Sequence, residues 1–303
     1  MFAAPQQLAA ALGAGVGHVR LELLEPPARG AAAETECDPV TEDLPTLFPQ
    51  PVRRLAHALT IAAVVAALVA CGDGPPYHST RGARLVHFTL HSRFTRSDLH
   101  EVLVVPPQHG RWLLVLLHGY HASPSQFLTQ PFFDTLGALG SRAPDVLLLD
   151  GGADSYWHDR ADGRWGSMVV REAIPAGIAR THARRVAIGG ISMGGYGALL
   201  ASSRHRGFCA VGVQSPALWP SAGETAPGAF DDARDYARND VFELRPPHPL
   251  WIDLGASDPF RAATLAYARR AGVRAHLRPG GHDAALWDAF TPQFLRFFAR
   301  ECA

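Results

Sequence analysis

The sequence predicts an α/β fold, in which a mostly parallel central sheet carries helices on both faces. From about residue 84 to residue 303, strand-like segments alternate with helix-like segments. One segment, RWLLVLLHG at residues 111–119, is apolar almost throughout, as is typical of a strand buried on both faces. The chain has 303 residues, 47% hydrophobic and 18% charged, which is enough for one large core.

The first part of this region supplies the opening strands and the first crossover. Residues 84–92 and 100–107 predict two antiparallel strands, and the apolar strand over 111–119 follows them. Next come a helix over 125–140 and a strand over 145–152. A change from strand to helix and back is the pattern of a parallel crossover, so the sheet becomes parallel from here.

The second part continues this alternation to the last helix. Residues 166–181 predict a helix that is interrupted or kinked at Pro175, because proline lacks the helical N–H. The elements that follow are strand 184–192, helix 193–205, strand 208–216, strand 249–257, helix 261–272, strand 273–281 and helix 284–300. The connection from Ser215 to His248 holds a possible helix over 231–244 and is too short for a lid domain.

The chain ahead of residue 84 has a different composition. Residues 1–51 are rich in Ala, Pro, Gly and Glu, without sustained periodicity, and are expected to be disordered or untranslated. Residues 52–71 contain two arginines and then an apolar run at 58–70, too short to span a bilayer but right for a signal peptide. Residues 72–83 predict a flexible tether, so the predicted folded domain spans residues 84–303.

The apolar run ends in Leu-Val-Ala-Cys at residues 68–71, which resembles the lipobox of bacterial lipoproteins. The resemblance implies that Cys71 is lipidated and that the protein is exported to the bacterial cell envelope, lipid-anchored or secreted. A short buried helix is the alternative. Because export machinery reads N-termini, translation is expected to begin at Val52, where a GTG codon would be read as methionine.

Charge and cysteine content exclude several classes of function. Lys+Arg and Asp+Glu both number 28, so no net field attracts nucleic acid, and none is expected as a partner. Cys37, Cys71, Cys209 and Cys302 are too few and too far apart for a disulfide scaffold or a paired metal site. Cys209 is expected to pack in the core, although pairing of Cys209 or Cys302 stays open. The fifteen histidines show no zinc spacing, so we expect neither metal nor cofactor.

A serine between glycines marks the turn from the strand at 184–192 to the next helix. Gly190-Ile191-Ser192-Met193-Gly194 has the form G-x-S-x-G in a strand-turn-helix context. A sharp turn of this kind strains the backbone at its apex, and glycines remove side chains that would clash there. The pattern therefore predicts a nucleophilic hydroxyl on Ser192; a glycine-rich packing turn with an incidental serine is the alternative.

A serine nucleophile needs a base and a group that orients the base, and both follow at strand ends. Asp258 lies just after the strand at 249–257, whereas Asp253 lies within that strand and is expected to be structural. His282 lies in a glycine-rich loop before the last helix, and Asp283 is expected to cap that helix. The other downstream histidines, His205, His248 and His276, are expected to be surface residues.

The tetrahedral intermediate also needs backbone donors for its oxyanion. One is expected from the N–H of Met193, directly after the nucleophile. The second is expected from the Tyr120 N–H, in the loop after the buried strand, with Gly119 letting the backbone turn towards the site. A mere tight turn is the alternative for this loop.

Together these motifs resemble the α/β-hydrolase superfamily, and within it the putative esterase group of esterase D, feruloyl and acetylxylan esterases and mycolyltransferases. The resemblance covers residues 84–303 and depends on LLHGY, GGISMGGYGAL, the Asp258 loop and PGGHD, in matching order. It implies an α/β-hydrolase fold without a large lid. The aromatic segment at 150–175 looks like a family loop, which implies that Asp150, Trp157 and Trp165 line an acyl or alcohol pocket or pack on the core.

The leading interpretation is a carboxylesterase-type serine hydrolase acting on a small-molecule or glycan ester. An acyltransferase of mycolyltransferase type, which passes the acyl group to a sugar, shares the same acyl-enzyme. A non-catalytic surface-binding lipoprotein is the third hypothesis; an intact Ser-Asp-His set argues against it. Substrate, acyl-chain length and oligomeric state stay open.

Overall fold

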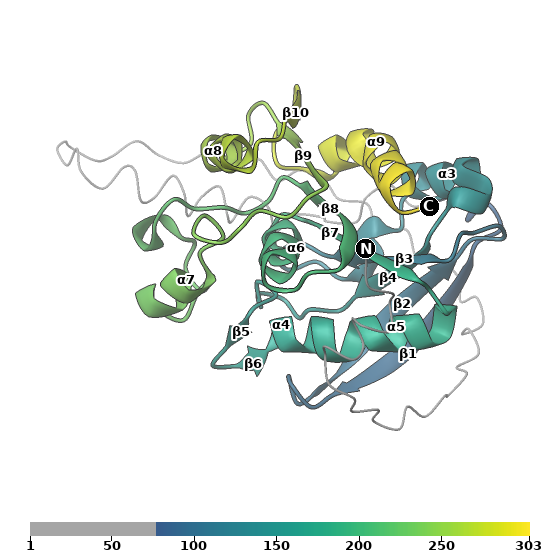
Figure 1. Ribbon diagram of the computed structural model, residues 1–303, viewed down its shortest axis with the longest axis horizontal. Coiled ribbons are helices and arrows are strands. Elements are labelled where there is room, and N and C mark those ends of the chain that lie inside the picture. The colour runs from purple at the N-terminus through teal and green to yellow at the C-terminus, as the bar shows by residue number, and fades with distance from the viewer. Residues whose placement is uncertain (1–76) are drawn as a thin grey trace, which may run out of the picture. The chain divides into compact units, whose positions relative to one another are not determined.

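A computed structural model describes residues 77–303, in which eight strands form one sheet (Figure 1). The strands are β1 (Arg84–Ser92), β2 (Ser97–Val105), β3 (Trp112–Leu117), β4 (Asp145–Leu149), β7 (Arg185–Ile191), β8 (Phe208–Gln214), β9 (Leu250–Gly255) and β10 (Ala275–Arg278). Their order is β1-β2-β4-β3-β7-β8-β9-β10. The pairs β1/β2 and β2/β4 are antiparallel and all later pairs are parallel, which confirms the predicted architecture.

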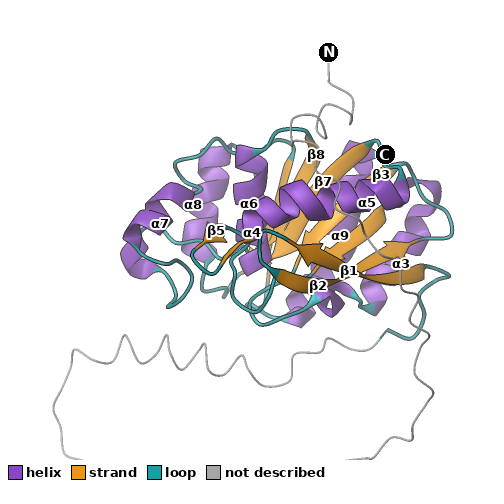
Figure 2. Cartoon of the chain, turned by 90° about the horizontal axis from the view of Figure 1, so that it is seen from below, coloured by secondary structure: helices purple, strands orange, loops and turns teal. Residues whose placement is uncertain are grey.

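Helices cover both faces of this sheet (Figure 2). They are α3 (Gln130–Leu139), α4 (Trp165–Met168), α5 (Ile174–Thr181), α6 (Met193–Arg204), α7 (Ala233–Asn239), α8 (Arg261–Ala271) and α9 (Ala284–Cys302). Alternate residues of β3 point to opposite faces: Leu113 and Leu117 pack in the core below α5 and α6, and Leu114 in the core below α3 and α9. Both faces of β3 are therefore buried, as its apolar sequence predicts.

Three of the expected helices differ in detail. The helix expected over 125–140 is divided into a 3-10 turn, Pro124–Phe127, and α3, with Pro131 in the first turn of α3. The helix expected over 166–181 contains a π-helical segment, Val169–Ala173. Pro175 then lies in the first turn of α5, where its missing N–H costs little. The third, α7, is shorter than predicted.

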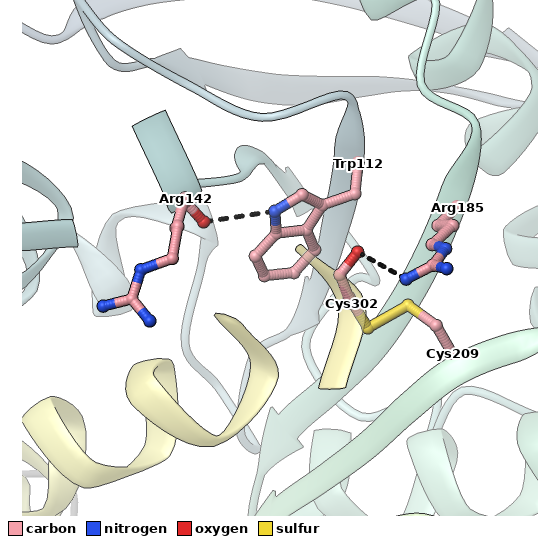
Figure 3. The surroundings of a disulfide bond; sticks show 5 residues. All are labelled: Trp112, Arg142, Arg185, Cys209 and Cys302. Carbon is pink, nitrogen blue, oxygen red and sulfur yellow. Dashed lines mark hydrogen bonds between the residues drawn. A yellow bond between two sulfur atoms is a disulfide. The ribbon is translucent and has the colours of Figure 1, made fainter. Parts of the chain in front are cut away.

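A disulfide joins Cys209, near the start of β8, to Cys302, at the end of α9 (Figure 3). The expectation that Cys209 only packs in the core is therefore wrong. The sequence does not predict the bond, because the two cysteines are 93 positions apart and come together only in the folded chain. Beside it, Arg185 Nη1 donates to the Cys302 carbonyl at 3.1 Å. These links fasten the end of α9 to the sheet.

The segments predicted at residues 1–51 and 52–71, including Cys71, lie outside the described residues, as does most of the tether at 72–83. Within residues 77–303, no helix is both long and apolar enough to cross a membrane. The same part of the chain contains no group of three or more His, Cys, Asp or Glu side chains that could hold a metal ion.

Candidate active site

Ser192 lies at the apex of the turn between β7 and α6, with φ 54° and ψ −114°. This left-handed backbone is strained for a residue with a side chain. A Cβ added at Gly194 would overlap the Leu117 carbonyl, and one added at Gly190 would overlap the backbone of Gly194. The two glycines therefore let α6 start against β3, and the turn holds the serine hydroxyl at the carboxyl edge of the sheet.

Ser192, His282 and Asp258 form a continuous hydrogen-bonded chain. His282 Nε2 lies 2.9 Å from Ser192 Oγ, and His282 Nδ1 lies 2.9 Å from Asp258 Oδ2. Because a carboxylate only accepts, Nδ1 donates to it, and Nε2 is left to accept the serine proton. The structure thus brings together three side chains up to 90 positions apart in the sequence, as their strand-end positions predict.

The loop that carries Asp258 is tied to the loop that carries His282. The backbone N–H groups of Ala256 and Ser257 donate to the carbonyls of Arg278 and Gly280, at 2.8 and 2.9 Å. Asp258 is 5% exposed, and its second oxygen accepts the Phe260 N–H at 2.8 Å. The other oxygen, Oδ2, is therefore left to accept the imidazole N–H, which fixes the orientation of the ring.

The neighbouring carboxylates have the structural roles that the sequence predicts. Asp283 caps α9, because its Oδ1 accepts the Leu286 N–H at 2.9 Å. Asp253 is fully buried in β9, where its oxygens accept hydrogen bonds from Trp251 Nε1 at 2.6 Å and from Gln214 Nε2 at 3.4 Å. Burial raises the pKa of Asp253 to about 8. Neither carboxylate has a hydrogen bond to His282 or Ser192.

The two backbone groups expected to bind an oxyanion are the N–H groups of Tyr120 and Met193. Among residues 77–303, neither the Tyr120 N–H nor the Met193 N–H donates a hydrogen bond to the protein. Their neighbours in the loop do: the N–H of His121 donates to the Ala153 carbonyl at 2.7 Å, and that of Gly119 to Gln126 Oε1 at 2.7 Å. The loop is thus held in place while these two N–H groups stay available.

His118 holds this loop in place through two hydrogen bonds of its ring. Its Nδ1 donates to the Gly119 carbonyl at 2.8 Å, and its Nε2 accepts the Gly151 N–H at 3.0 Å. This pattern requires the neutral ring, and burial lowers the pKa of His118, which favours that form. The histidine of the LLHGY motif therefore positions the oxyanion loop rather than exchanging protons with a substrate.

The predicted pocket residues have different positions. A Cβ at Gly119 would lie 3.6 Å from the Ser192 Cβ, so this glycine borders the nucleophile. Trp157 is only 1% exposed and donates to the His118 carbonyl at 3.1 Å, so its expected place in a pocket is corrected to the core. The Asp150 carboxylate accepts the N–H groups of Gly152 and His100 at 3.1 Å each, and Trp165 packs against Gly152. Asp150 therefore joins its loop to β2, and Trp165 packs against the same loop.

Aromatic side chains that the motifs do not identify surround the imidazole. Phe260 and Trp287 lie edge-on to His282, with ring centroids 5.3 and 5.2 Å away. Trp219 contacts Phe260 at 5.5 Å, and Tyr156 contacts Trp219 at 5.6 Å. We call these four residues the aromatic wall. In the sequence, Phe260 lies near Asp258, Trp287 near His282 and Tyr156 in the aromatic segment, which is too weak a signal to identify them, and Trp219 lies near none of these.

The fold and this geometry define the class of the molecule as an α/β-hydrolase, and comparisons with known proteins agree. Residues 172–302 match the family model described as "Putative esterase". A solved structure of a ferulic acid esterase is 21% identical, with 72% of this chain and 98% of that chain covered and a TM-score of 0.60. No curated protein matches the chain.

Two further solved structures share this fold. An S-formylglutathione hydrolase from Agrobacterium tumefaciens is 20% identical, covering 75% of this chain and 98% of that chain, with a TM-score of 0.63. Mycobacterium tuberculosis MPT51 (FbpC1) is 16% identical, covering 73% of this chain and 100% of that chain, with a TM-score of 0.52. These likenesses confirm the α/β-hydrolase fold.

Residues 172–302 thus resemble the esterase group, and the chain has the α/β-hydrolase fold, which confirms the predicted resemblance at this level. The match supports an enzyme of the serine hydrolase class with ester hydrolase or acyltransferase activity.

Proposed function

We propose that this protein is a serine carboxylic ester hydrolase that acts through an acyl-enzyme on Ser192. The observation that carries the proposal is the hydrogen-bonded chain from Ser192 Oγ through His282 to Asp258, built on a strained turn. A hydroxyl is a weak nucleophile until a base accepts its proton, and this base is already oriented.

In the first half-reaction, Ser192 Oγ attacks the ester carbonyl carbon while its proton passes to His282 Nε2. The carbonyl oxygen becomes an oxyanion and accepts the N–H groups of Tyr120 and Met193. The intermediate collapses, the alcohol leaves with the proton from Nε2, and an ester of Ser192 remains. Asp258 stabilises the imidazolium that forms between these two transfers.

In the second half-reaction, water attacks the acyl-enzyme with His282 as general base, and the acid and free Ser192 are released. The aromatic wall supports this chemistry, because apolar rings against His282 limit the access of bulk water. A sugar hydroxyl in place of water would make the protein an acyltransferase. Hydrolysis is the proposal, and transfer is an outcome that its test can reveal.

The test measures turnover of p-nitrophenyl acetate and butyrate by the full-length protein and by Ser192→Ala. We expect wild-type turnover, and for the variant a loss of at least about 10³-fold. A fluorophosphonate probe should label Ser192 alone, as mapped by peptide mass spectrometry. Equal rates for the two proteins would reject the proposal in favour of a binding lipoprotein. Faster acyl release with an added sugar acceptor would favour the transferase.

We also propose that the enzyme is exported and anchored through a lipid on Cys71. The apolar run at 58–70 and the lipobox-like residues 68–71 support this proposal. The disulfide between Cys209 and Cys302 also supports it, because such bonds persist in oxidising compartments. Metabolic labelling with a radioactive fatty acid in the native host tests it. Label on wild type but not on Cys71→Ala is expected, whereas peptides from residues 1–50 in the mature protein would contradict it.

A further inference from the structure

Gln126 lies beside the nucleophile, although no sequence motif singles it out. It belongs to the 3-10 turn Pro124–Phe127, seven residues after Gly119. We infer that its side-chain amide donates a third hydrogen bond to the oxyanion, next to the Tyr120 and Met193 N–H groups. This inference rests on the proposed ester hydrolysis at Ser192.

The orientation of the amide is set by one hydrogen bond. The Gly119 N–H donates to Gln126 Oε1 at 2.7 Å, and only the oxygen of an amide can accept. The NH₂ group is therefore the other end of the amide. If the Gln126 amide were rotated by 180°, its NH₂ group would face the Gly119 N–H, and two donors form no hydrogen bond. The loop itself thus specifies which end of Gln126 is free.

The free end lies on the same side of Gly119 as the nucleophile. A Cβ built on Gly119 would be 3.5 Å from Gln126 Nε2 and 3.6 Å from the Ser192 Cβ. Because Gly119 has no side chain, this loop residue leaves the space next to Gln126 Nε2 and the Ser192 Cβ unfilled. This is the space that the carbonyl of an ester bound to Ser192 would enter, since Gly119 precedes the oxyanion donor Tyr120.

The NH₂ group has no protein partner to hold it elsewhere. Within residues 77–303, Gln126 Nε2 donates to no other residue, and it is not one of the fully enclosed polar atoms without a partner. A ligand can therefore reach it. By contrast, Gln130, at the start of α3, uses its Nε2 on Asp134 Oδ1 at 2.7 Å.

Within residues 77–303, three donors of this region have no protein partner: the Tyr120 N–H, the Met193 N–H and the Gln126 NH₂. An oxyanion can accept three hydrogen bonds, whereas the carbonyl oxygen of the bound ester accepts two well. The third bond would therefore strengthen as the tetrahedral intermediate forms, and a contact of this kind raises kcat more than it lowers KM.

The competing explanation is that Gln126 only anchors the loop through Oε1. Two substitutions distinguish the explanations. Gln126→Glu keeps an oxygen acceptor for the Gly119 N–H but replaces the donor by a carboxylate. Gln126→Met removes both functions at similar volume. An anchoring role predicts near wild-type kcat for Gln126→Glu and impairment for Gln126→Met, whereas a donor role predicts loss in both and a larger loss for Gln126→Glu.

The experiment measures kcat and KM for p-nitrophenyl acetate with full-length wild type, both variants and Ser125→Glu. Ser125 is an exposed neighbour whose hydroxyl contacts Ser123 Oγ, so Ser125→Glu controls for added charge. For Gln126→Glu we expect kcat to fall at least about tenfold, towards the 10²–10³-fold loss seen for a removed oxyanion donor. KM should change less than about twofold, and Ser125→Glu should match wild type.

The melting temperature of each variant guards against misfolding. If Gln126→Glu melts with wild type and keeps wild-type kcat, the third donor is rejected while ester hydrolysis stands. If Gln126→Glu lowers the melting temperature, the rate of inhibition by an uncharged phosphonate ester at 10 °C decides: unchanged phosphonylation of Ser192 rejects the donor, and slower phosphonylation supports it. A wild type without turnover that depends on Ser192 overturns both proposals.

Discussion

Asp258 and Asp283 show how nearby carboxylates acquire different roles. Asp258 lies at the end of a short loop after β9 and has one free oxygen, which meets His282 Nδ1. Asp283 directly follows His282 in sequence, yet its carboxylate turns back to cap α9. Sequence position after a strand distinguishes these two, because a residue before a helix has unpaired N–H groups next to it.

Replacing Asp258 by Asn should lower kcat by about 10⁴-fold, because the amide favours the wrong imidazole tautomer. Asp283→Asn is the matched control, since asparagine is also a good helix cap. It should keep kcat within about twofold of wild type. Steady-state turnover of p-nitrophenyl acetate measures both. A larger loss in Asp283→Asn than in Asp258→Asn would exchange the two assignments.

Asp253 should make the protein less stable as pH rises. Burial raises its pKa to about 8 in the folded protein, whereas in the unfolded chain the carboxyl has its ordinary pKa of 3.8. Between these values the unfolded state binds fewer protons, so the free energy of unfolding falls with increasing pH. Asp253→Asn removes this dependence and should gain at least about 1 kcal/mol relative to wild type between pH 5 and pH 8.

Urea unfolding at the two pH values measures the difference. Asp154→Asn, at an exposed position, is the control and should follow wild type at both values. A constant difference between Asp253→Asn and wild type from pH 5 to pH 8 would show that the folded carboxyl is already ionised at pH 5.

The sequence predicts that Ser192, His282 and Asp258 lie together, because each lies in a motif or directly after a strand, and the structure shows this contact. They did not identify Gln126 or the aromatic wall. The Gln126 amide contacts Gly119 only because the 3-10 turn folds back over the loop. Trp219 and Phe260 come from separate connections, and their contact depends on tertiary packing. For Trp157 the sequence leaves both roles open, because no feature of an aromatic loop distinguishes residues that line a pocket from residues that pack in the core.

At the scale of elements, β7, β3 and α6 approach one another closely at the turn that carries Ser192. The start of α6 lies against the end of β3, with no room for a side chain at Gly194. The sequence predicts these strands and α6 well, because apolar runs and a glycine-rich turn are local signals. It does not predict the π-helical segment Val169–Ala173 or the small hairpin of β5 (Asp159–Arg160) and β6 (Gly163–Arg164). Both depend on contacts with distant residues.

Gly194→Ala should therefore affect both stability and catalysis. The added methyl group would push α6 away from the Leu117 carbonyl, at a cost of at least about 2 kcal/mol. It would also move the Met193 N–H, so kcat should fall more than about tenfold. Gly223→Ala, where an added Cβ meets nothing within 4 Å, is the control. Wild-type kcat and melting temperature in Gly194→Ala would show that α6 does not need this close approach.

At the scale of the whole molecule, the disulfide is expected to contribute to stability and not to catalysis, because it lies far from Ser192, Asp258 and His282. Cys209 lies near the amino end of β8, whereas Ser192, Asp258 and His282 gather at the carboxyl ends of the parallel strands. Cysteine spacing alone left this pair open, because a bridge between residues 93 positions apart depends on how the sheet and the last helix pack.

The double variant Cys209→Ser, Cys302→Ser should lose about 2–5 kcal/mol of unfolding free energy. Its kcat at 25 °C should stay within about twofold of wild type, because the bond lies at the opposite edge of the sheet from the triad. Denaturant unfolding and steady-state turnover measure the two quantities. Reduced wild type should unfold like the variant, and equal stability of oxidised and reduced protein would contradict the prediction.

The same bond imposes an order on biosynthesis. The thiol of Cys209 emerges from the ribosome first and must remain unpaired while 93 further residues, with Asp258 and His282 among them, are made. In a chain that starts at Val52, the other thiol available during that interval is that of Cys71. Lipidation converts a thiol to a thioether, so Cys71, acylated as proposed, could no longer capture Cys209. The proposed anchor would in this way also exclude one mispaired disulfide.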